Sequence, residues 1–281
     1  LSIAIPPYAT HYVELLPEQG AAPFSHTLRL EGPAWTRLVP VEVRAGTRMW
    51  WSNRGDAGHS WLQRRIDLRG VSHAELTYDL WYDIEWGWDW AGVRVSTDEG
   101  ENWEWVEGLQ SVVPPPGTGA PEAAYTGRSG VKGAPDGSRP AEWVQERIDL
   151  GSYAGREILV RFDMVTDDAV NEPGLCIDNL AIDAIEWRNE DEASDDGWVA
   201  SGFAPIGNQV PLEYLVQAVT YAGDEASVSR LEASGGHGEW QIADLGRYAN
   251  RVVLVISALT DPVGPISTED IRFTLTIDRV P

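Results

Sequence analysis

The sequence predicts an all-β protein, in which an antiparallel jelly-roll-like β-sandwich is joined to a second, smaller β-sandwich. Three observations lead to this fold class. Apolar and polar residues alternate with a period of two in many short segments, which Gly, Pro and Asp separate. No window carries a convincing apolar stripe at helical spacing over three turns. The 28 Gly and 18 Pro residues suit the turns between many short antiparallel strands.

The alternating segments follow one another along the chain. In the longest of them, every second residue from Leu76 to Ile84 falls on one face, and the residues between them, from Thr77 to Glu85, fall on the other. Strand-like segments also stand at both ends of the chain, 1–5 and 271–278, where unpaired edges could pair between copies. The expected strands are 27–31, 74–85, 91–96, 142–150, 157–165, 175–182, 215–221, 238–242, 251–258 and 272–277.

Two irregular stretches suggest how the chain is organised. Residues 186–198 are strongly acidic and follow an apolar segment, which suggests a linker or the entry to a second domain. This places the larger sandwich at 1–187 and the smaller one at 188–281. Residues 110–141 are rich in Pro, Gly and Ser, and we expect them to form a long surface loop packed over a sheet edge.

The composition excludes several classes of function. The formal net charge of -23 argues against binding to nucleic acid or to an anionic membrane, because both need a basic surface. No stretch of 18 apolar residues exists, so membrane insertion is not expected. Cys176 is the single cysteine and lies in an apolar run, which predicts a buried, inert thiol. The five histidines show no zinc-binding spacing.

Residues 96–103 fit the pattern Ser-x-Asp-x-Gly-x-x-Trp, which resembles the Asp-box of secreted β proteins. We expect the Asp98 carboxylate to accept backbone N–H bonds across a hairpin turn. Gly100 would supply a positive φ and Trp103 would pack under the hairpin. The pattern predicts a local turn and carries little information on function.

Tryptophans are concentrated between residues 81 and 105 of the chain. Most of them suit a sandwich core, to which an indole ring brings a large apolar surface. Trp86, Trp88 and Trp90 stand at a strand break, where at least one ring is expected to point outward. Exposed rings could stack on sugar faces, so these three residues form a candidate ligand-binding surface.

Carboxylates gather in several short segments and leave three interpretations open. Asp83, Glu85 and Asp89 form one group, Asp167 and Asp168 a second, and Asp178 lies in an apolar strand. Such oxygen clusters suit Ca²⁺, but they also suit a glycosidase acid pair or a solvated acidic face. Asp83 and Glu85 lie on one strand face about 7 Å apart along the backbone, which fits an acid pair. Since the neighbours of Asp178 suggest partial burial, its carboxylate needs either N–H donors or a cation.

A series of motifs over residues 50–280 resembles the non-catalytic region of immune inhibitor A-like secreted bacterial proteases. The motifs cover 81–91, 95–103, 125–130, 148–155, 160–170, 177–179 and 196–203. The resemblance implies a MAM-like jelly roll with an adjoining β domain, located outside the cell or on its surface. It also implies structural calcium, with Asp178 and Glu31 as candidate ligands. The His-Glu-x-x-His zinc motif of the family's protease domain is absent, so protease activity does not carry over.

These observations favour a non-enzymatic extracellular β-sandwich module for accessory or adhesive functions. Its partner would be a protein, a glycan or further copies of the chain, as in a surface layer or filament. The alternative is a carbohydrate-binding module that uses Trp86, Trp88 and Trp90. A glycosidase that uses Asp83 and Glu85 is the third hypothesis.

Overall fold

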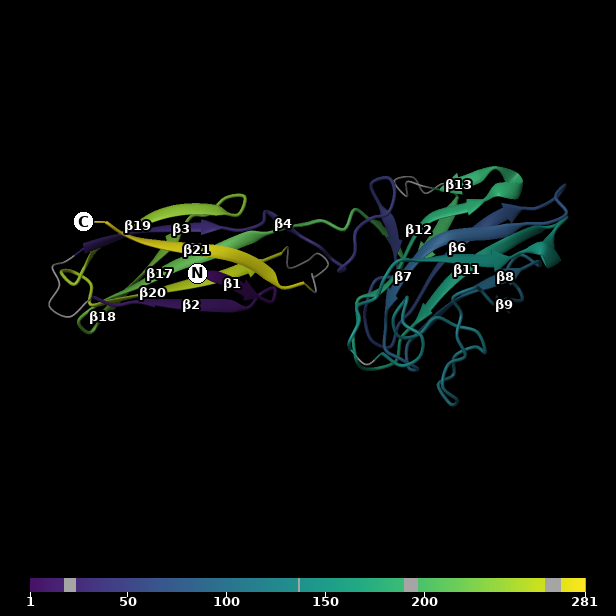
Figure 1. The fold of residues 1–281 in the computed structure, drawn as a ribbon, viewed down its shortest axis with the longest axis horizontal. Helices are drawn as coiled ribbons and strands as arrows, with labels where there is room; N and C mark the ends of the chain where they lie inside the picture. Colours follow the sequence, from purple (N-terminus) through teal and green to yellow (C-terminus); the bar gives the residue numbers. More distant parts are fainter. Residues whose placement is uncertain (18–23, 136, 190–196, 261–268, 281) are drawn as a thin grey trace. The chain divides into compact units, whose positions relative to one another are not determined.

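The computed structural model describes residues 1–17, 24–135, 137–189, 197–260 and 269–280, without the side chains of residues 243 and 244. The chain forms two compact units (Figure 1). Unit 1 comprises Leu1–Val41 and Gln209–Pro281, and unit 2 comprises Glu42–Asn208. Two short 3₁₀ helices, η1 (Gly151–Tyr153) and η2 (Asp183–Ile185), accompany the strands. Within these described ranges, no helix has the length and apolar character needed to cross a membrane.

Unit 1 is a sandwich of two four-stranded antiparallel sheets. The first has the order β1 (Ser2–Ile5), β21 (Ile271–Val280), β3 (Phe24–Glu31) and β19 (His237–Leu245). The second has the order β18 (Glu225–Leu231), β17 (Glu213–Ala222), β20 (Arg251–Leu259) and β2 (Thr10–Leu15). Leu28, Leu30 and Phe273 of the first sheet share one buried cluster with Val216 and Leu254 of the second. The short strands β4 (Trp35–Thr36) and β16 (Val210–Pro211) pair with each other.

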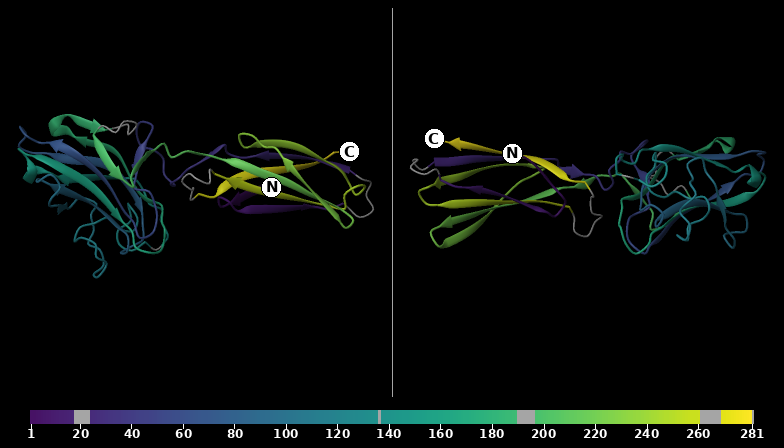
Figure 2. Two further views of the ribbon diagram at one scale, coloured as in Figure 1. Left: turned by 180° about the vertical axis from the view of Figure 1, so that it is seen from behind. Right: turned by 60° about the horizontal axis from the view of Figure 1, so that its bottom comes forward.

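Unit 2 is also a two-sheet sandwich, seen from two further directions in Figure 2. Its six-stranded sheet has the order β10 (Val144–Asp149), β7 (Glu75–Asp83), β12 (Gly174–Ile182), β5 (Met49–Trp51) and β15 (Ala204–Ile206), with β13 (Trp187–Asn189) also paired to β12. Its five-stranded sheet has the order β14 (Trp198–Ser201), β6 (His59–Asp67), β11 (Glu157–Val165), β8 (Trp90–Ser96) and β9 (Glu104–Val106). Most connections pass from one sheet to the other, as expected for a jelly roll.

The strand faces follow from the alternation in the sequence. On β7, Leu76, Tyr78 and Leu80 are buried, and they share the core with Val93 of β8 and Phe162 of β11. The all-β sandwich class is therefore confirmed. Trp81 is 1% exposed as well, although it lies on the other face of β7, where Thr77, Asp79 and Asp83 are only partly buried.

The division into units differs from the expected division at residue 187. Strands β1 to β3 pair with β19, β20 and β21, so the two ends of the chain build unit 1 together. Pairing between such distant segments leaves no mark on local alternation. The expected linker 186–198 does not connect the units. Its flanks form β13 and the start of β14, which pair with β12 and β6 within unit 2, and its residues 190–196 lie outside the described residues.

The long segment 110–141 is held against the strands of unit 2 by buried polar contacts. Tyr125 exchanges backbone hydrogen bonds with Ala91 of β8, and its hydroxyl lies 2.8 Å from the Tyr78 hydroxyl. At the start of the segment, the Gln110 N–H donates to the buried Glu146 carboxylate of β10 at 3.0 Å. Burial raises the pKa of Glu146, although backbone N–H bonds and Tyr125 partly offset this effect. These contacts agree with the expectation of a packed loop.

The Asp-box expectation also agrees with the structure. The pattern forms the turn between β8 and β9, where the Asn102 N–H donates to Asp98 Oδ1 at 2.8 Å. Gly100 has a φ of +89°, and a Cβ there would lie 3.3 Å from the Trp103 ring. Trp103 Nε1 donates to the Gly100 carbonyl at 3.0 Å, which fixes the ring against the hairpin.

Candidate functional site

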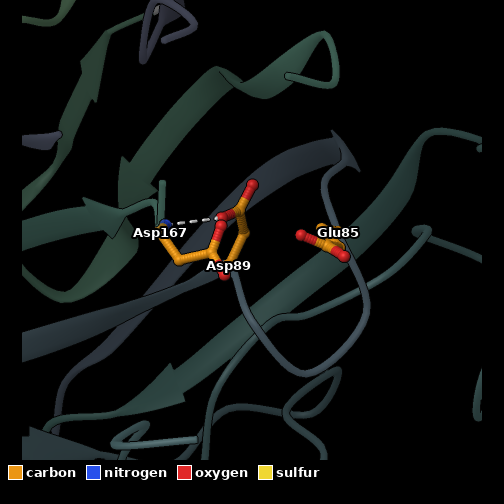
Figure 3. A group of neighbouring side chains, drawn as sticks. All are labelled: Glu85, Asp89 and Asp167. Carbon is orange, nitrogen blue, oxygen red and sulfur yellow. Dashed lines mark hydrogen bonds between the residues drawn. The ribbon is translucent and has the colours of Figure 1, made fainter. Parts of the chain in front are cut away.

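Three carboxylates converge at one end of the β8–β11 pair in unit 2. Glu85 lies in the turn after β7, Asp89 directly precedes β8, and Asp167 follows β11. Each offers an oxygen, and the three oxygens lie within 4.8 Å of one another (Figure 3). Because β8 and β11 pair with Val165 opposite Trp90, the ends of the two strands bring Asp89 and Asp167 together. We call Glu85, Asp89 and Asp167 the acidic cluster.

The turn that carries Glu85 and Asp89 is fixed by short-range contacts. The Asp89 N–H donates to the Glu85 carbonyl at 3.2 Å, and Gly87 between them has a φ of +82°. From the long segment, the Thr126 hydroxyl accepts the Gly87 N–H at 2.7 Å and donates to the Glu85 carbonyl. The Asp167 N–H donates to Asp89 Oδ1 at 3.0 Å, the bond drawn in Figure 3. The backbone thus fixes where the three carboxylates meet.

The acidic cluster carries an excess of negative charge. Asp89 is 3% exposed, and desolvation by burial raises its pKa to about 6, with a further contribution from the charges of Asp167 and Glu85. The pKa of Glu85 is also raised, by burial and by the negative charges of the neighbouring Asp167 and Glu172. A bound cation would remove this repulsion, because opposite charge favours the ionised form.

The residues present fit a hard divalent cation. Carboxylate oxygens are the ligands that Ca²⁺ prefers, and turns between strands give the variable geometry that it tolerates. The sequence analysis grouped Asp83 with Glu85 and Asp89, but the structure directs Asp83 elsewhere, into an ion pair of 2.9 Å with Arg128. It places Asp167 in the cluster and leaves Asp168 exposed. An acid pair formed by Asp83 and Glu85 gains no support, because Arg128 engages one of the two carboxylates.

The candidate calcium ligands Glu31 and Asp178 lie in different units. Glu31 ends β3 in unit 1, and Asp178 lies on β12 in unit 2. The Asp178 side chain is fully buried, and its Oδ2 accepts the N–H groups of Arg44 and Ala45 at 2.7 and 3.2 Å. Its Oδ1 accepts the Asn179 N–H at 2.8 Å. Backbone donors therefore account for the burial of Asp178, and the observed carboxylate cluster is the one at Asp89.

The three tryptophans of the candidate ligand surface differ in exposure. Trp88 is 55% exposed. Trp86 is half-buried over Gly127, where a Cβ would lie 2.9 Å from its ring. Trp90 is half-buried and meets Trp105 edge-on, with ring centroids 5.4 Å apart. A flat exposed platform of three rings is therefore absent from this described turn, and Trp88 remains as the single outward ring.

A row of alternating Trp and Arg side chains covers the outer face of the five-stranded sheet. Arg94 lies over Trp105 and Trp103, with its Cζ 4.8 and 5.6 Å from their ring centroids. Arg161 lies over Trp61 and Trp103 at 4.5 and 5.3 Å. Each of these three rings therefore already has a guanidinium group over it. The Trp and Arg side chains of this row thus pack on one another by cation–π contacts.

The buried carboxylate of Asp163 holds this row together. It accepts two bonds from Arg94, at 2.7 and 2.6 Å, and lies 3.3 Å from Arg161 and 2.6 Å from His59. Arg94 and Arg161 face each other directly across β8 and β11, an arrangement that would be repulsive without Asp163 between them. This group was not among the residues that the sequence pattern marked. The polar residues at positions 161 and 163 of β11 were the available signal, because they alternate with the core residues of that strand.

Comparison with known proteins agrees with this architecture. Residues 30–207 match the family described as "Immune inhibitor A-like, MAM domain". The pre-pro-metalloprotease PrtV of Vibrio cholerae serotype O1 is 26% identical over 203 residues, which is 71% of this chain and 20% of that protein. Immune inhibitor A of Bacillus thuringiensis subsp. alesti is 23% identical over 138 residues, which is 49% of this chain and 17% of that protein.

The chain thus spans about a fifth of the length of these relatives. The crystal structure of dimeric latent PorU from Porphyromonas gingivalis aligns with 89% of this chain and 23% of that one. The TM-score is 0.20 and the identity is 9%, values too low to indicate a shared fold. The family match covers 178 of the 281 residues (30–207), all but one of unit 2 among them, and this domain class is non-catalytic. The chain therefore belongs to the immune inhibitor A-like MAM domain family.

Proposed function

We propose that this chain is a non-enzymatic accessory module that acts outside the cell and binds a partner. The observation that carries the proposal is how its buried acids are used. The four buried carboxylates in the described part of the chain each accept N–H or guanidinium bonds that fix a loop or a surface layer. These four are Asp89, Glu146, Asp163 and Asp178. Such carboxylates act as structural anchors and are poorly placed for acid–base chemistry on a substrate.

The proposal is tested by assays for turnover. Purified protein is incubated with casein and with a panel of chromogenic glycosides, with and without zinc or calcium. We expect no turnover above buffer, because the sequence lacks the zinc motif and the buried carboxylates of the described residues are already engaged by N–H or guanidinium donors. Hydrolysis that is lost in a Glu85→Gln or Asp83→Asn variant would overturn the proposal in favour of a glycosidase.

The location outside the cell is part of the same proposal. It is supported by the relatives, which include a pre-pro-metalloprotease and an immune inhibitor, and by the acidic surface of this chain. Fractionation of the source organism with an antibody against the purified protein tests the location. Recovery in the medium or on the cell surface is expected, and recovery in the cytosol alone would contradict it.

We propose that the acidic cluster binds Ca²⁺ as a structural ion. Glu85, Asp89 and Asp167 would hold the ion, which would clamp the turn before β8 to the end of β11. Since a ligand that binds only the folded state stabilises it, calcium should raise the melting temperature and chelator should lower it. A melting curve that is the same in calcium and in chelator would remove the site.

A carbohydrate-binding module remains the second candidate, and the exposure of Trp88 favours it. One outward indole gives one stacking platform, so we expect weak glycan binding that depends on this ring. A glycan array with wild-type and Trp88→Ala protein tests it. Trp105→Ala is the matched control, because this partly exposed ring already has Arg94 over it and meets Trp90 edge to face. Equal binding of wild type and Trp88→Ala would exclude this surface.

A further inference from the structure

In the part of unit 1 that the structure describes, one sheet has two long strand edges that no further strand, proline or bulge interrupts. Among the described residues, β2 pairs only with β20, and β18 pairs only with β17. Neither strand contains Pro or Lys, and the register of each pairing runs without a bulge. Soluble proteins usually interrupt such edges with Pro, Lys, bulges or a cover. The other sheet of unit 1 follows this rule, because β1 has four residues before Pro6 and β19 has a register shift between Ile242 and Leu245.

The strand directions allow this sheet to continue into a second copy. All three pairings in the order β18-β17-β20-β2 are antiparallel. The four strands therefore alternate in direction, and the two edges run opposite to each other. A copy displaced sideways without rotation would place its β18 antiparallel to β2, so the ladder would continue unbroken. Such contacts are head-to-tail and can repeat without closing.

The exposed apolar residues of the two edges lie on the same sheet face. Tyr12 of β2 pairs with Val255, and Val228 of β18 pairs with Val219. Val255 and Val219 share a face, because Val255 pairs with Gln217, which is two residues from Val219 on β17. Tyr12 is 65% exposed and Val228 is 62% exposed. Placed opposite each other between two copies, they would bury the largest exposed apolar side chains of both edges.

Charge and apolar contact together favour this register over the two registers shifted by two residues. With Tyr12 opposite Val228, Glu14 faces Ala226, and its own charge is paired with Arg251 at 3.4 Å. A shift of two residues in one direction would move Glu14 past the end of β18, beside Asp224 of the adjoining turn, where the like charges repel each other. A shift in the other direction would place Glu14 opposite Val228 and separate the two apolar residues.

We propose that chains associate head-to-tail through unit 1, with β2 of one copy paired to β18 of the next and Tyr12 opposite Val228. The proposal rests on the partner-binding function above and names that partner as a second copy of this chain. Both strands lie outside residues 30–207, so the family match does not include this interface. Since six residues of strand edge bury little area, we expect association to be weak and concentration-dependent.

Cysteine crosslinking tests the proposed register. The single native thiol, Cys176, is buried, so introduced cysteines are the accessible ones. Facing residues of an antiparallel pair have Cβ atoms about 4.5–5.5 Å apart, close to disulfide geometry. A Tyr12→Cys/Val228→Cys variant, oxidised at high concentration, should give a ladder of linked chains on a non-reducing gel. A Val13→Cys/Val228→Cys control should stay monomeric, because Val13 faces the other side of the sheet.

Other outcomes overturn the proposal. Disulfide dimers from Tyr12→Cys alone would indicate a two-fold β2–β2 contact instead. An equal ladder from the Val13→Cys control would indicate random collision. A monomer at every concentration in sedimentation, together with the absence of a ladder, would exclude the edge contact. A Val228→Lys variant should keep the circular dichroism spectrum of the wild type and lose the association, which separates loss of the edge from loss of the fold.

The outcome is independent of the test of the proposed function. A monomeric protein without turnover would exclude only the edge contact. Turnover of a glycoside or peptide would exclude the non-enzymatic function and would leave the crosslinking result standing.

Discussion

Replacement of Asp89 by Asn should change the stability of unit 2 in opposite directions with and without calcium. The Asp89 carboxylate is buried, and its pKa of about 6 compares with a usual value of 3.8. At 1.36 kcal/mol per pKa unit, this difference corresponds to about 3 kcal/mol of unfavourable free energy for the ionised form in the folded state. Asn is neutral and its Oδ1 can still accept the Asp167 N–H. In chelator at pH 7.5, Asp89→Asn should therefore be more stable than wild type by up to about 3 kcal/mol.

The pH dependence follows from the same shift. Because the pKa is raised on folding, Asp89 contributes most stability below pH 3.8, and this contribution is lost as the pH rises through about 6. The advantage of Asp89→Asn should thus shrink toward pH 4. Calcium reverses the order at pH 7.5, because ionised Asp89 gains a cation that the Asn variant binds poorly. At a calcium concentration of 1,000 Kd the wild type would gain about 4.1 kcal/mol, which exceeds the advantage of about 3 kcal/mol that the variant has in chelator.

Urea unfolding followed by Trp fluorescence measures both effects. Four conditions are needed, namely pH 4 and pH 7.5, each with calcium and with chelator. Asp168→Asn is the matched control, since Asp168 is exposed beside the cluster and should leave stability unchanged in all four. The reasoning is refuted if Asp89→Asn is less stable than wild type in chelator at pH 7.5, or if calcium stabilises both proteins equally.

Three further predictions concern side chains outside the acidic cluster. Asp163→Ala should lower the free energy of unfolding by about 3–5 kcal/mol, since it leaves two guanidinium groups without their shared carboxylate; a loss below 1 kcal/mol in urea unfolding would contradict this role. Trp103→Ala should lower the free energy of unfolding by about 1–2 kcal/mol, because it removes two cation–π contacts. Trp88→Ala should change this free energy by less than about 0.5 kcal/mol. Thermal melts of the two variants check the contrast, and equal losses of stability would refute it. Cys176, whose thiol pKa burial raises, should resist a thiol reagent in the folded protein and react in 6 M guanidinium, so rapid native labelling would show that β12 is open.

Local alternation predicted several of the strands that build the core of unit 2, but it missed β6, whose Leu62 and Ile66 are buried in that core. The expected strand 157–165 coincides with β11, and the expected face of 74–85 is the buried face of β7. Alternation fails for β5, whose three residues Met49–Trp51 are all buried, and for the exposed strand β18. Neither shows the contrast between an inner and an outer face that makes a strand visible in sequence.

The candidate site was predictable only in part for a related reason. Glu85 and Asp89 share one turn, so their proximity follows from their spacing in sequence. Asp167 joins them through the pairing of β8 with β11, which no local pattern specifies. For Asp178, the sequence indicated burial and the need for a partner. The partners are the N–H groups of Arg44 and Ala45, which lie far away in the chain.

The insertion of unit 2 into unit 1 has a mechanical consequence. The chain leaves unit 1 after β4 and returns at β16, and these two strands are hydrogen-bonded to each other. Tension applied through the chain on either side of this protein would enter at β1 and leave at β21, two neighbouring strands of one sheet in unit 1. While β4 and β16 stay paired, segment 42–208 carries none of that load, because the chain enters and leaves it at this one pair of strands. Unit 2 would then keep its acidic cluster and its row of Trp and Arg side chains folded under a pulling force that unfolds strands of unit 1.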